Sequence, residues 1–180
     1  MQNQNESRGL AIGLTVLSAL GRLVPHAPNV TPVGGSCLFA GSRVPGGLAY
    51  LIPVLAMAAT DPLVGGFHLA SFGIYAAFLV NVWIGRRLVR KVTPFRVGAA
   101  AFLCSLQFFL VSNFAVWLAG DASPAPYYAL NLHGLVACYA AAIPFWGRTL
   151  AGDLLFSAAL FGMYELLKTR FATESSATVL

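Results

Sequence analysis

Long apolar runs alternate along the chain with short clusters of polar, Gly and Pro residues, and these clusters mark the ends of the predicted helices. The first apolar run predicts a helix from about Arg8 to Val24. It follows a polar stretch, Met1 to Ser7, that we expect to be a flexible tail. The segment from Pro25 to Pro32 contains three prolines in eight residues, which excludes a regular helix. We therefore expect an irregular loop after the first helix.

A turn divides the next apolar run into two short helices. Val33 to Thr60 is 28 residues long, which is more than the ~20 residues that one span requires. Ser42 to Gly47 contains a Pro and two Gly residues and interrupts this run. The pattern predicts a hairpin of two short helices, from about Gly34 to Gly41 and from about Leu48 to Thr60. The Asp61-Pro62 pair is expected to end the second of them.

Three further helices are predicted in the rest of the chain, from about Leu69 to Ile84, Val97 to Ala119 and Leu150 to Leu167. The apolar stretch from His133 to Phe145 either spans the membrane or re-enters it. Gly134 and Pro144 interrupt this stretch, so we favour a re-entrant segment before the last helix. The predicted fold class is all-α, a polytopic membrane protein with six transmembrane helices and a flexible tail at 171–180.

Composition supports the membrane class and a single transmembrane domain, residues 1–180. Hydrophobic residues make up 58% of the chain, and the mean hydropathy is +0.74. Runs of ~20 apolar residues suffice to cross the ~30 Å of hydrocarbon in a bilayer. An N-terminal apolar run can also be a cleaved signal peptide, but no clean cleavage site follows it, so we favour an uncleaved first helix. The three cysteines form no CxxC pair and no disulfide framework.

Basic residues flank the apolar runs and predict the orientation of the chain. The net charge is +5, and the strongest positive cluster runs from Arg86 to Arg96. Because cytoplasmic loops of membrane proteins are enriched in Lys and Arg, we interpret this charge as an orientation signal and expect no nucleic acid as a partner. Six spans with both termini in the cytoplasm place nine of the eleven Lys and Arg residues inside and leave Arg22 and Arg148 outside. A model with seven spans places eight Lys and Arg residues inside and three outside. The predicted location is a bacterial inner membrane.

Polar side chains with binding chemistry gather at the predicted outer face. They include all three histidines, two aspartates and one arginine: His26, Asp61, His68, His133, Arg148 and Asp153. Asn29 lies in the Pro-rich loop beside them. Polar groups in an apolar shell are typical of a pocket for a polar solute, and ionisable groups at membrane depth usually have a function. The alternative is that these are interface residues on hydrated loops.

Two other kinds of site receive less support from the sequence. Three His and two Asp residues can ligate a cation, but no HxxxH or HExxH spacing is present, so we expect no metal and no cofactor. An enzyme needs a nucleophile beside a base, and Ser36, Cys37 and Ser71 lie in no recognisable motif. The chain is therefore not expected to be an enzyme.

Arg148 admits two interpretations. Its guanidinium suits a carboxylate, phosphate or amide of a solute, which makes it a candidate binding residue. Alternatively, it forms an internal ion pair with Asp61 or Asp153 and holds the outer loops together. Asp153 itself is expected in the first turn of the last helix, where the helix dipole favours an anion.

Small residues recur every four positions in the first predicted helix, at Ala11, Thr15 and Ala19. Such a stripe permits another helix to approach closely. It is consistent with packing inside the bundle and with docking to a partner subunit, and the sequence leaves both open.

The order of these segments resembles a known family of transporters. The segment from Ile143 to Leu155, IPFWGRTLAGDLL, is similar to the region before the last helix in biotin-type S components, the substrate-binding subunits of energy-coupling factor (ECF) transporters. The stretch from Arg22 to Gly35, RLVPHAPNVTPVGG, resembles S-component-like bacterial membrane proteins that are related to the solitary vitamin B12 transporter BtuM. The resemblance covers nearly the whole chain.

This resemblance implies six helices, cytoplasmic termini and a substrate pocket under the outer loops. At positions that match the BtuM-like pattern, it implies binding roles for His26, Asp61, Tyr75 and Arg148. The cobalt-ligating Cys of that pattern is missing, since Gly65 to Tyr75 reads GGFHLASFGIY. His68 or His26 can ligate cobalt instead. Cobalamin or another corrinoid is thus one candidate among vitamin-like solutes.

The resemblance also implies partners. In ECF transporters a small-residue stripe on helix 1 docks to the transmembrane coupling subunit. Ala11, Thr15 and Ala19 match that stripe imperfectly, because Thr replaces an Ala. No GxxxxGKS/T motif is present, so an ATP-driven mechanism requires separate ATPases. The expected partners are a small-molecule substrate, the lipid bilayer and, in an ECF-type system, the coupling subunit and ATPases.

The sequence thus predicts a membrane uptake protein that binds a vitamin-like small molecule at the outer face. The remaining alternatives are an accessory or structural membrane subunit without a ligand and, less favoured, a membrane-embedded enzyme. The substrate-binding candidates are His26, Asn29, Asp61, His68, Tyr75, Arg148 and Asp153.

Overall fold

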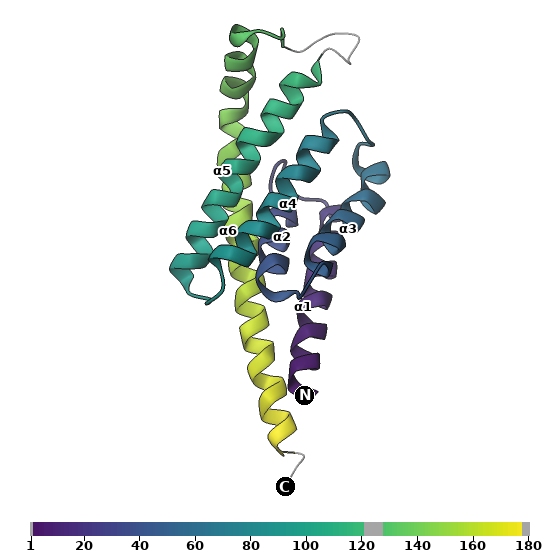
Figure 1. The fold of residues 1–180 in the computed structure, drawn as a ribbon, viewed down its shortest axis with the longest axis vertical. Coiled ribbons are helices and arrows are strands. Elements are labelled where there is room, and N and C mark those ends of the chain that lie inside the picture. The colour runs from purple at the N-terminus through teal and green to yellow at the C-terminus, as the bar shows by residue number, and fades with distance from the viewer. Residues whose placement is uncertain (1, 121–127, 178–180) are drawn as a thin grey trace.

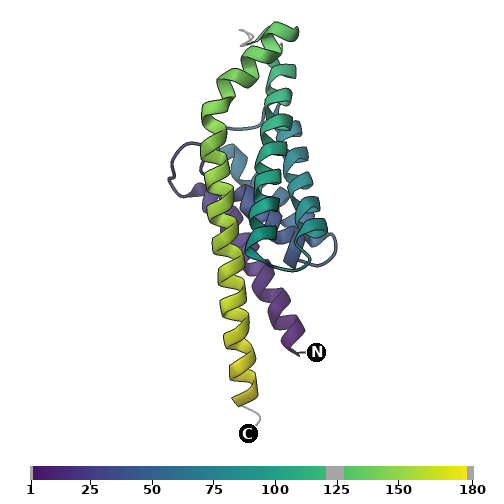
Figure 2. The same cartoon turned by 90° about the vertical axis from the view of Figure 1, so that its left-hand side faces the viewer.

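The computed structural model describes residues 2–120 and 128–177 (Figures 1 and 2). Within these residues the chain is all-helical and contains no strand, as predicted. The elements in chain order are α1 (Gln2–Leu20), the 3₁₀ turn η1 (Gly21–Leu23), α2 (Val33–Arg43), α3 (Leu48–Val64), α4 (Ser71–Leu88), α5 (Pro94–Leu118) and α6 (Leu132–Ala177). Both ends of the described chain lie at the same end of the molecule in both views.

The helix α2 is the centre of the bundle (Figure 1). Its residues from Val33 to Gly41 are buried, and it packs against each of the other five α-helices. Gly41 lies against the carbonyl group of Val82 in α4, and Gly85 of α4 lies against the carbonyl group of Leu38. A Cβ atom at either glycine would overlap the carbonyl oxygen, so only glycine lets the two backbones touch here.

Aromatic and charged side chains join α2 to α6. Phe39 is fully buried and packs edge-on against Phe161 and Tyr164, with ring centroids 5.2 and 5.6 Å apart. Arg43, one turn later, forms an ion pair with Glu165 at 3.1 Å. These contacts hold α6 along α2 and so bring the earlier part of α6 beside the N-terminus of α2.

The predicted hairpin of α2 and α3 is confirmed, with its turn at residues 44–47. However, α3 is longer than predicted, because it continues through Asp61 and Pro62. A proline in the last turn removes only one helical hydrogen bond, and the helix ends instead at Gly65 and Gly66. The N–H groups of both glycines donate to the Asp61 carbonyl oxygen, and Gly66 has a φ of 80°. Asp61 is therefore fixed in a helix rather than in a loop.

The re-entrant segment predicted before the last helix is wrong. α6 is one continuous helix of 46 residues, or ~69 Å at ~1.5 Å per residue, and it includes Pro144. A proline removes one hydrogen bond and bends a helix, but the neighbouring turns keep theirs. Figure 2 accordingly shows α6 curving in its N-terminal, green part. Residues 171–177, expected as a tail, continue α6, and 178–180 lie outside the described residues.

The small-residue stripe of α1 lies inside the bundle. Ala11 and Thr15 are fully buried and Ala19 is 1% exposed, and α1 packs against α2, α3 and α6. The Thr15 hydroxyl donates to the Ala11 carbonyl oxygen at 2.8 Å, so its burial leaves no unpaired donor. Neighbouring helices thus cover the stripe, which agrees with packing inside the bundle and leaves its residues inaccessible to a docking partner in this arrangement. The helix also starts at Gln2, so the polar residues before Arg8 are helical rather than a separate tail.

Two described helices are long and apolar enough to cross a membrane, Pro94–Leu118 and the part of α6 from Leu132 to Thr169. The helix α3 is apolar but shorter. Large apolar side chains are also widely exposed, for example Phe72 at 78% and Phe95 at 84%. Apolar surface of this extent normally contacts a partner or a bilayer. The helix lengths and the exposed surface together favour association with a membrane.

Candidate functional site

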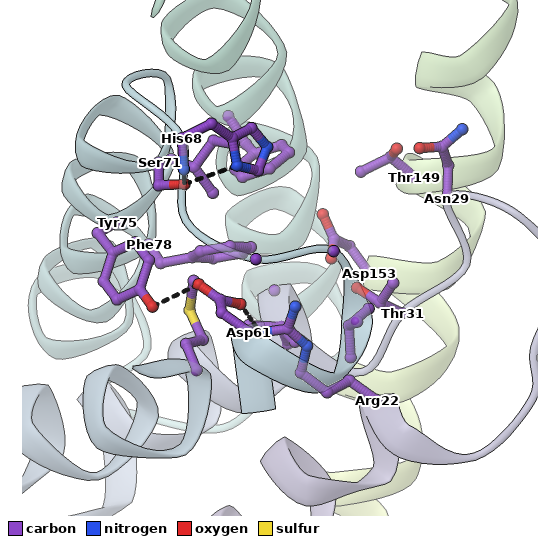
Figure 3. Close-up of a pocket in the computed structure, with 18 residues that line it drawn as sticks. Arg22, Asn29, Thr31, Asp61, His68, Ser71, Tyr75, Phe78, Thr149 and Asp153 are labelled. Atoms are coloured by element: carbon purple, nitrogen blue, oxygen red, sulfur yellow. Dashed lines mark hydrogen bonds and ion pairs between the residues drawn. The ribbon is translucent and has the colours of Figure 1, made fainter. Parts of the chain in front are cut away.

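A cavity of about 340 Å³ lies at the N-terminal end of α2 (Figure 3). Its walls come from η1, the loop before α2, the α3–α4 loop, and helices α2 to α6. The polar side chains that line it are Arg22, Asn29, Thr31, Asp61, His68, Ser71, Tyr75, Thr149 and Asp153. Apolar side chains such as Met57, Phe78 and Phe108 complete the lining. The contributing elements are far apart in the sequence, so the tertiary fold creates the cavity.

The Pro-rich loop between η1 and α2 places Asn29 at the cavity. Ala27 to Val30 forms a turn in which the Val30 N–H donates to the Ala27 carbonyl oxygen at 3.0 Å. Pro28 occupies the second position and Asn29 the third, with a φ of 64° that Asn tolerates better than most residues. The loop packs on α6 at Gly152, where a Cβ atom would come within 3.3 Å of Val30 Cα. The turn and this close approach hold the loop over the cavity.

Arg22, Asp61 and Tyr75 form a connected polar network on one wall of the cavity (Figure 3). Arg22 Nη1 lies 2.8 Å from Asp61 Oδ1, and the Tyr75 hydroxyl donates to Asp61 Oδ2 at 2.5 Å. The Arg22 and Asp61 side chains are only 16% and 9% exposed. Nη1 is close to the carboxylate without being aligned as a hydrogen bond, so its N–H groups have no acceptor among the described residues. The charge of Asp61 is therefore balanced, while Arg22 keeps a free donor.

Asp153 lies on the opposite wall and is only 4% exposed. Its carboxylate packs against Gly34 in the first turn of α2, in the space that a Cβ atom would occupy. Among the described residues, no basic side chain pairs with this carboxylate and no N–H or O–H group donates to it. Figure 3 shows the side chain directed toward the cavity. Asp153 is thus a buried carboxylate without a protein partner.

His68 and Ser71 form the rim of the cavity at the start of α4. The His68 backbone N–H donates to Ser71 Oγ at 3.1 Å, and Ser71 Oγ lies 3.3 Å from His68 Nδ1. Ser71 is buried, whereas His68 is exposed. The pair orders the α3–α4 loop and presents one imidazole at the mouth of the cavity.

A second cavity of about 310 Å³ adjoins the first. The two share Asn29, Phe108 and Thr149. The second is lined by four aromatic rings of α5 and α6 and by the polar side chains of Asn29, Ser112, Asn113 and Thr149, and the rings of Phe109 and Trp146 lie 5.4 Å apart. Trp146 Nε1 is buried and has no acceptor among the described residues. A polar cavity and an aromatic cavity therefore meet at Asn29 and Thr149.

A family model described as a family of unknown function, DUF6580, matches residues 2–176. The chain belongs to this family. The match covers all the helices and both cavities. No curated protein and no solved structure matches the chain significantly.

In this DUF6580 chain, five of the seven predicted substrate-binding residues line the first cavity: Asn29, Asp61, His68, Tyr75 and Asp153. His26 and Arg148 do not line it, and both are exposed. Arg148 has neither of the aspartate partners considered for it, because Asp61 pairs with Arg22. The structure thus separates the two residues from the site for which they were predicted.

Arg22 lines the cavity of this DUF6580 chain, although its place in the sequence was interpreted only as part of the orientation signal. An arginine next to a Pro-rich loop at a helix end is the signal that indicates such a site residue. Thr149 was also missed, and its position four residues before Asp153 places the two on one face of a helix.

The described part of this DUF6580 chain contains no group of three or more His, Cys, Asp or Glu residues placed to hold a metal ion. Of the three candidate nucleophiles, Ser36 and Cys37 do not line the cavity. The Ser36 hydroxyl lies 2.6 Å from that of Ser18, and Cys37 is fully buried. Ser71 lines the cavity but is engaged with His68. The charged and hydrogen-bonding groups of the cavity wall are therefore chiefly those of Arg22, Asp61, Tyr75 and Asp153.

Proposed function

We propose that this protein is a multi-pass membrane protein that binds a small, vitamin-like solute in the first cavity and takes part in its uptake, as S components do. The observation that carries the proposal is a cavity that collects polar side chains from six segments of an otherwise apolar chain, with Asp61, Ser71 and Asp153 buried among them. Ionisable side chains inside membrane proteins are costly and usually serve a substrate or ion pathway. The Arg22–Asp61–Tyr75 network and Asp153 have this character.

The size of the cavity supports a small solute. Ligand pockets commonly range from about 300 to 1,000 Å³, and 340 Å³ is at the lower end. A corrinoid macrocycle is much larger than such a space. The segment from Gly65 to Tyr75 also lacks the thiol that BtuM-like proteins use for cobalt. Both observations favour a solute smaller than cobalamin.

The arrangement of the termini supports an orientation with both termini in the cytoplasm, with the short α2 covered inside the helix bundle. Both ends of the described chain lie at one end of the molecule, and the basic α4–α5 connection lies toward the same end (Figures 1 and 2). Basic segments are retained in the cytoplasm, so the cavity, which lies nearer the opposite end, would open outward. The chain has no nucleotide-binding motif, so ATP-driven uptake would require partner subunits.

The proposal is tested on the full chain purified in mild detergent. Native mass spectrometry is expected to reveal a co-purified small molecule, and adding that molecule to emptied protein should raise the melting temperature in proportion to ln[ligand] above its Kd. Tyr75→Phe should weaken this stabilisation, because it removes the hydroxyl that holds Asp61. Leu166→Ala, at an exposed position of α6 far from the cavity, is the matched control.

The two alternatives predict different results. An accessory subunit would contain no small molecule and would not be stabilised by any vitamin or vitamin precursor in a panel. An enzyme would convert the bound molecule, which mass spectrometry would detect as a new species after incubation.

A further inference from the structure

The charges that line the first cavity do not cancel. Arg22 and Asp61 form an ion pair, and Tyr75 donates to the same carboxylate, so that wall is close to neutral. Asp153 faces it with no partner among the described residues. His68 is at the rim and can add a positive charge only when protonated. The cavity is thus negative in net charge when Asp153 is ionised.

The position of Asp153 is built into the fold. Glycine at position 34 leaves the space that the carboxylate occupies, and glycine at 152 lets the Pro-rich loop pack directly on the same turn of α6. The side chain is 96% buried and directed into the cavity (Figure 3). An ionised carboxylate in such surroundings is strongly destabilising unless a cation or several donors compensate it. The described protein supplies neither, so the charge of Asp153 is compensated either by a bound proton in the empty cavity or by a cationic ligand.

We propose that the cavity recognises its solute through a cationic nitrogen, an ammonium or amidinium group, that pairs with Asp153. This inference rests on the proposed function and names the class of solute. An anionic solute would meet a repulsive carboxylate and an arginine whose charge Asp61 already balances. A cationic N–H group completes the charge and the hydrogen bonding of Asp153 at once.

The adjoining cavity indicates an organic rather than an inorganic cation. It shares Asn29, Phe108 and Thr149 with the first cavity, and the Phe109 and Trp146 rings line it. Flat apolar groups pack well against such rings, and Ser112 and Asn113 in the lining provide polar groups for a substituent. A simple metal ion would use neither feature, and no group of metal ligands surrounds Asp153 in the described structure. The solute therefore combines a cationic nitrogen with a flat, largely apolar portion.

The test compares the wild-type chain with Asp153→Asn and with Arg148→Ala, which keeps the cavity and removes an exposed charge on the same helix. Molecules released from each protein are identified by native mass spectrometry. Tryptamine and indole-3-acetate serve as added probes that share a ring and differ in charge. We expect a cationic molecule in the wild type and in Arg148→Ala, and stabilisation of both by tryptamine but not by indole-3-acetate. Asp153→Asn should bind the same amines about 10- to 100-fold more weakly.

The stability of the empty protein separates a ligand-binding role of Asp153 from a structural role. If Asp153 binds a ligand, replacing this buried, unpaired carboxylate by a neutral amide should leave the melting temperature of the empty protein unchanged or raise it. If Asp153 is structural, the melting temperature should fall. A large decrease, with unaltered amine affinity in the folded fraction, would assign Asp153 to the scaffold and overturn the inference.

The failures of the two proposals differ. A released molecule that is anionic, or one that binds Asp153→Asn as tightly as wild type, overturns the cationic class but retains the binding function. Stabilisation by sodium or potassium chloride alone that depends on Asp153 overturns the organic class. If no molecule is released and neither probe stabilises the wild type, both proposals fail. The charge of the molecule released from the wild type decides the class even if Asp153→Asn does not fold.

Discussion

Asp61 is held from two sides, by the Arg22 guanidinium and by the Tyr75 hydroxyl. Because all three side chains are at least partly buried, neither charge has free access to water when its partner is removed. Removing one partner of a buried ion pair destabilises the fold more than replacing both partners, because the remaining charge is left uncompensated. This asymmetry distinguishes a structural network from a set of independent ligand contacts.

Arg22→Met should therefore lower the free energy of unfolding of the empty protein by ~3–5 kcal/mol. The double variant Arg22→Met/Asp61→Asn should recover a large part of this loss, because it removes both charges. Thermal or chemical unfolding in detergent measures both effects. Arg148→Ala, an exposed arginine without a described ion-pair partner, is the control and should change stability by less than ~0.5 kcal/mol. Equal losses in the single and double variants would contradict the network.

The site could be predicted at the residues where polarity alone identifies a function. Asp61 and Asp153 interrupt apolar segments, and both line the cavity. Tyr75 also lines it, but only the resemblance to BtuM-like proteins indicated that residue. The prediction that Arg148 lies at the site was wrong, because it depended on a helix break at Pro144. In a continuous helix, residues five apart differ by ~140° around the axis, so Arg148 and Asp153 point to different sides. Thr149, four residues before Asp153, shares its side and lines the cavity.

At the scale of elements, the contact between α2 and α4 depends on two glycines that face each other's backbones. Gly41 and Gly85 approach the carbonyl groups of Val82 and Leu38 so closely that a methyl group has no room. These carbonyl groups belong to the helix backbone, so they cannot move aside for a methyl group as the end of a flexible side chain can. The separation of the two helices is therefore fixed by these positions, and with it the alignment of the first cavity.

Gly85→Ala should accordingly destabilise the protein by ~1–3 kcal/mol through overpacking. Gly162→Ala is the matched control, because it is also a helical glycine but has open space around its Cβ position. It should be neutral or stabilising by up to ~1 kcal/mol, since Ala favours a helix more than Gly. Melting temperatures of the two variants, measured side by side, separate the effect of packing from that of helix propensity. A loss of the same size in both would contradict the close approach.

The helices themselves were largely predictable, because apolar runs and turn residues determine them. The turn at residues 44–47 and the helices α3, α4 and α5 were anticipated, whereas the continuation of α3 through Pro62 and of α6 through Pro144 was not. Pro62 and Pro144 both lie inside helices, since one missing hydrogen bond costs less than the packing that continuation provides. The burial of the α1 stripe was not predictable either, because a small residue facing a partner and one facing a neighbouring helix look alike in sequence.

At the scale of the whole molecule, the continuous α6 makes the proposed topology directly testable. The start of α6 lies at one end of the molecule, and its C-terminal part lies at the other, near the start of α1 (Figures 1 and 2). Asn131 and Lys168 are both exposed, and they flank the long apolar part of this helix.

Single cysteines at Asn131 and Lys168 should differ in their reaction with a membrane-impermeant maleimide in intact cells. We expect labelling of Asn131→Cys and no labelling of Lys168→Cys until the membrane is permeabilised. The native cysteines Cys37, Cys104 and Cys138 are buried and can be replaced by alanine to remove background. Labelling of Lys168→Cys from outside would reject cytoplasmic termini, and labelling of both positions would reject a single crossing by α6.

The complete enclosure of α2 also constrains the order in which the chain can be assembled. At 11 residues, or ~16 Å, α2 reaches only about half of the ~30 Å hydrocarbon thickness, so it cannot be released into lipid as a finished span. The helices that cover it most extensively besides its own hairpin, α4 and α6, are synthesised later. On the proposed membrane topology, the nascent hairpin would therefore stay at the membrane surface or in the insertion machinery until α6 emerges. A chain that ends before α6 would leave this short helix uncovered on the side against which α6 packs.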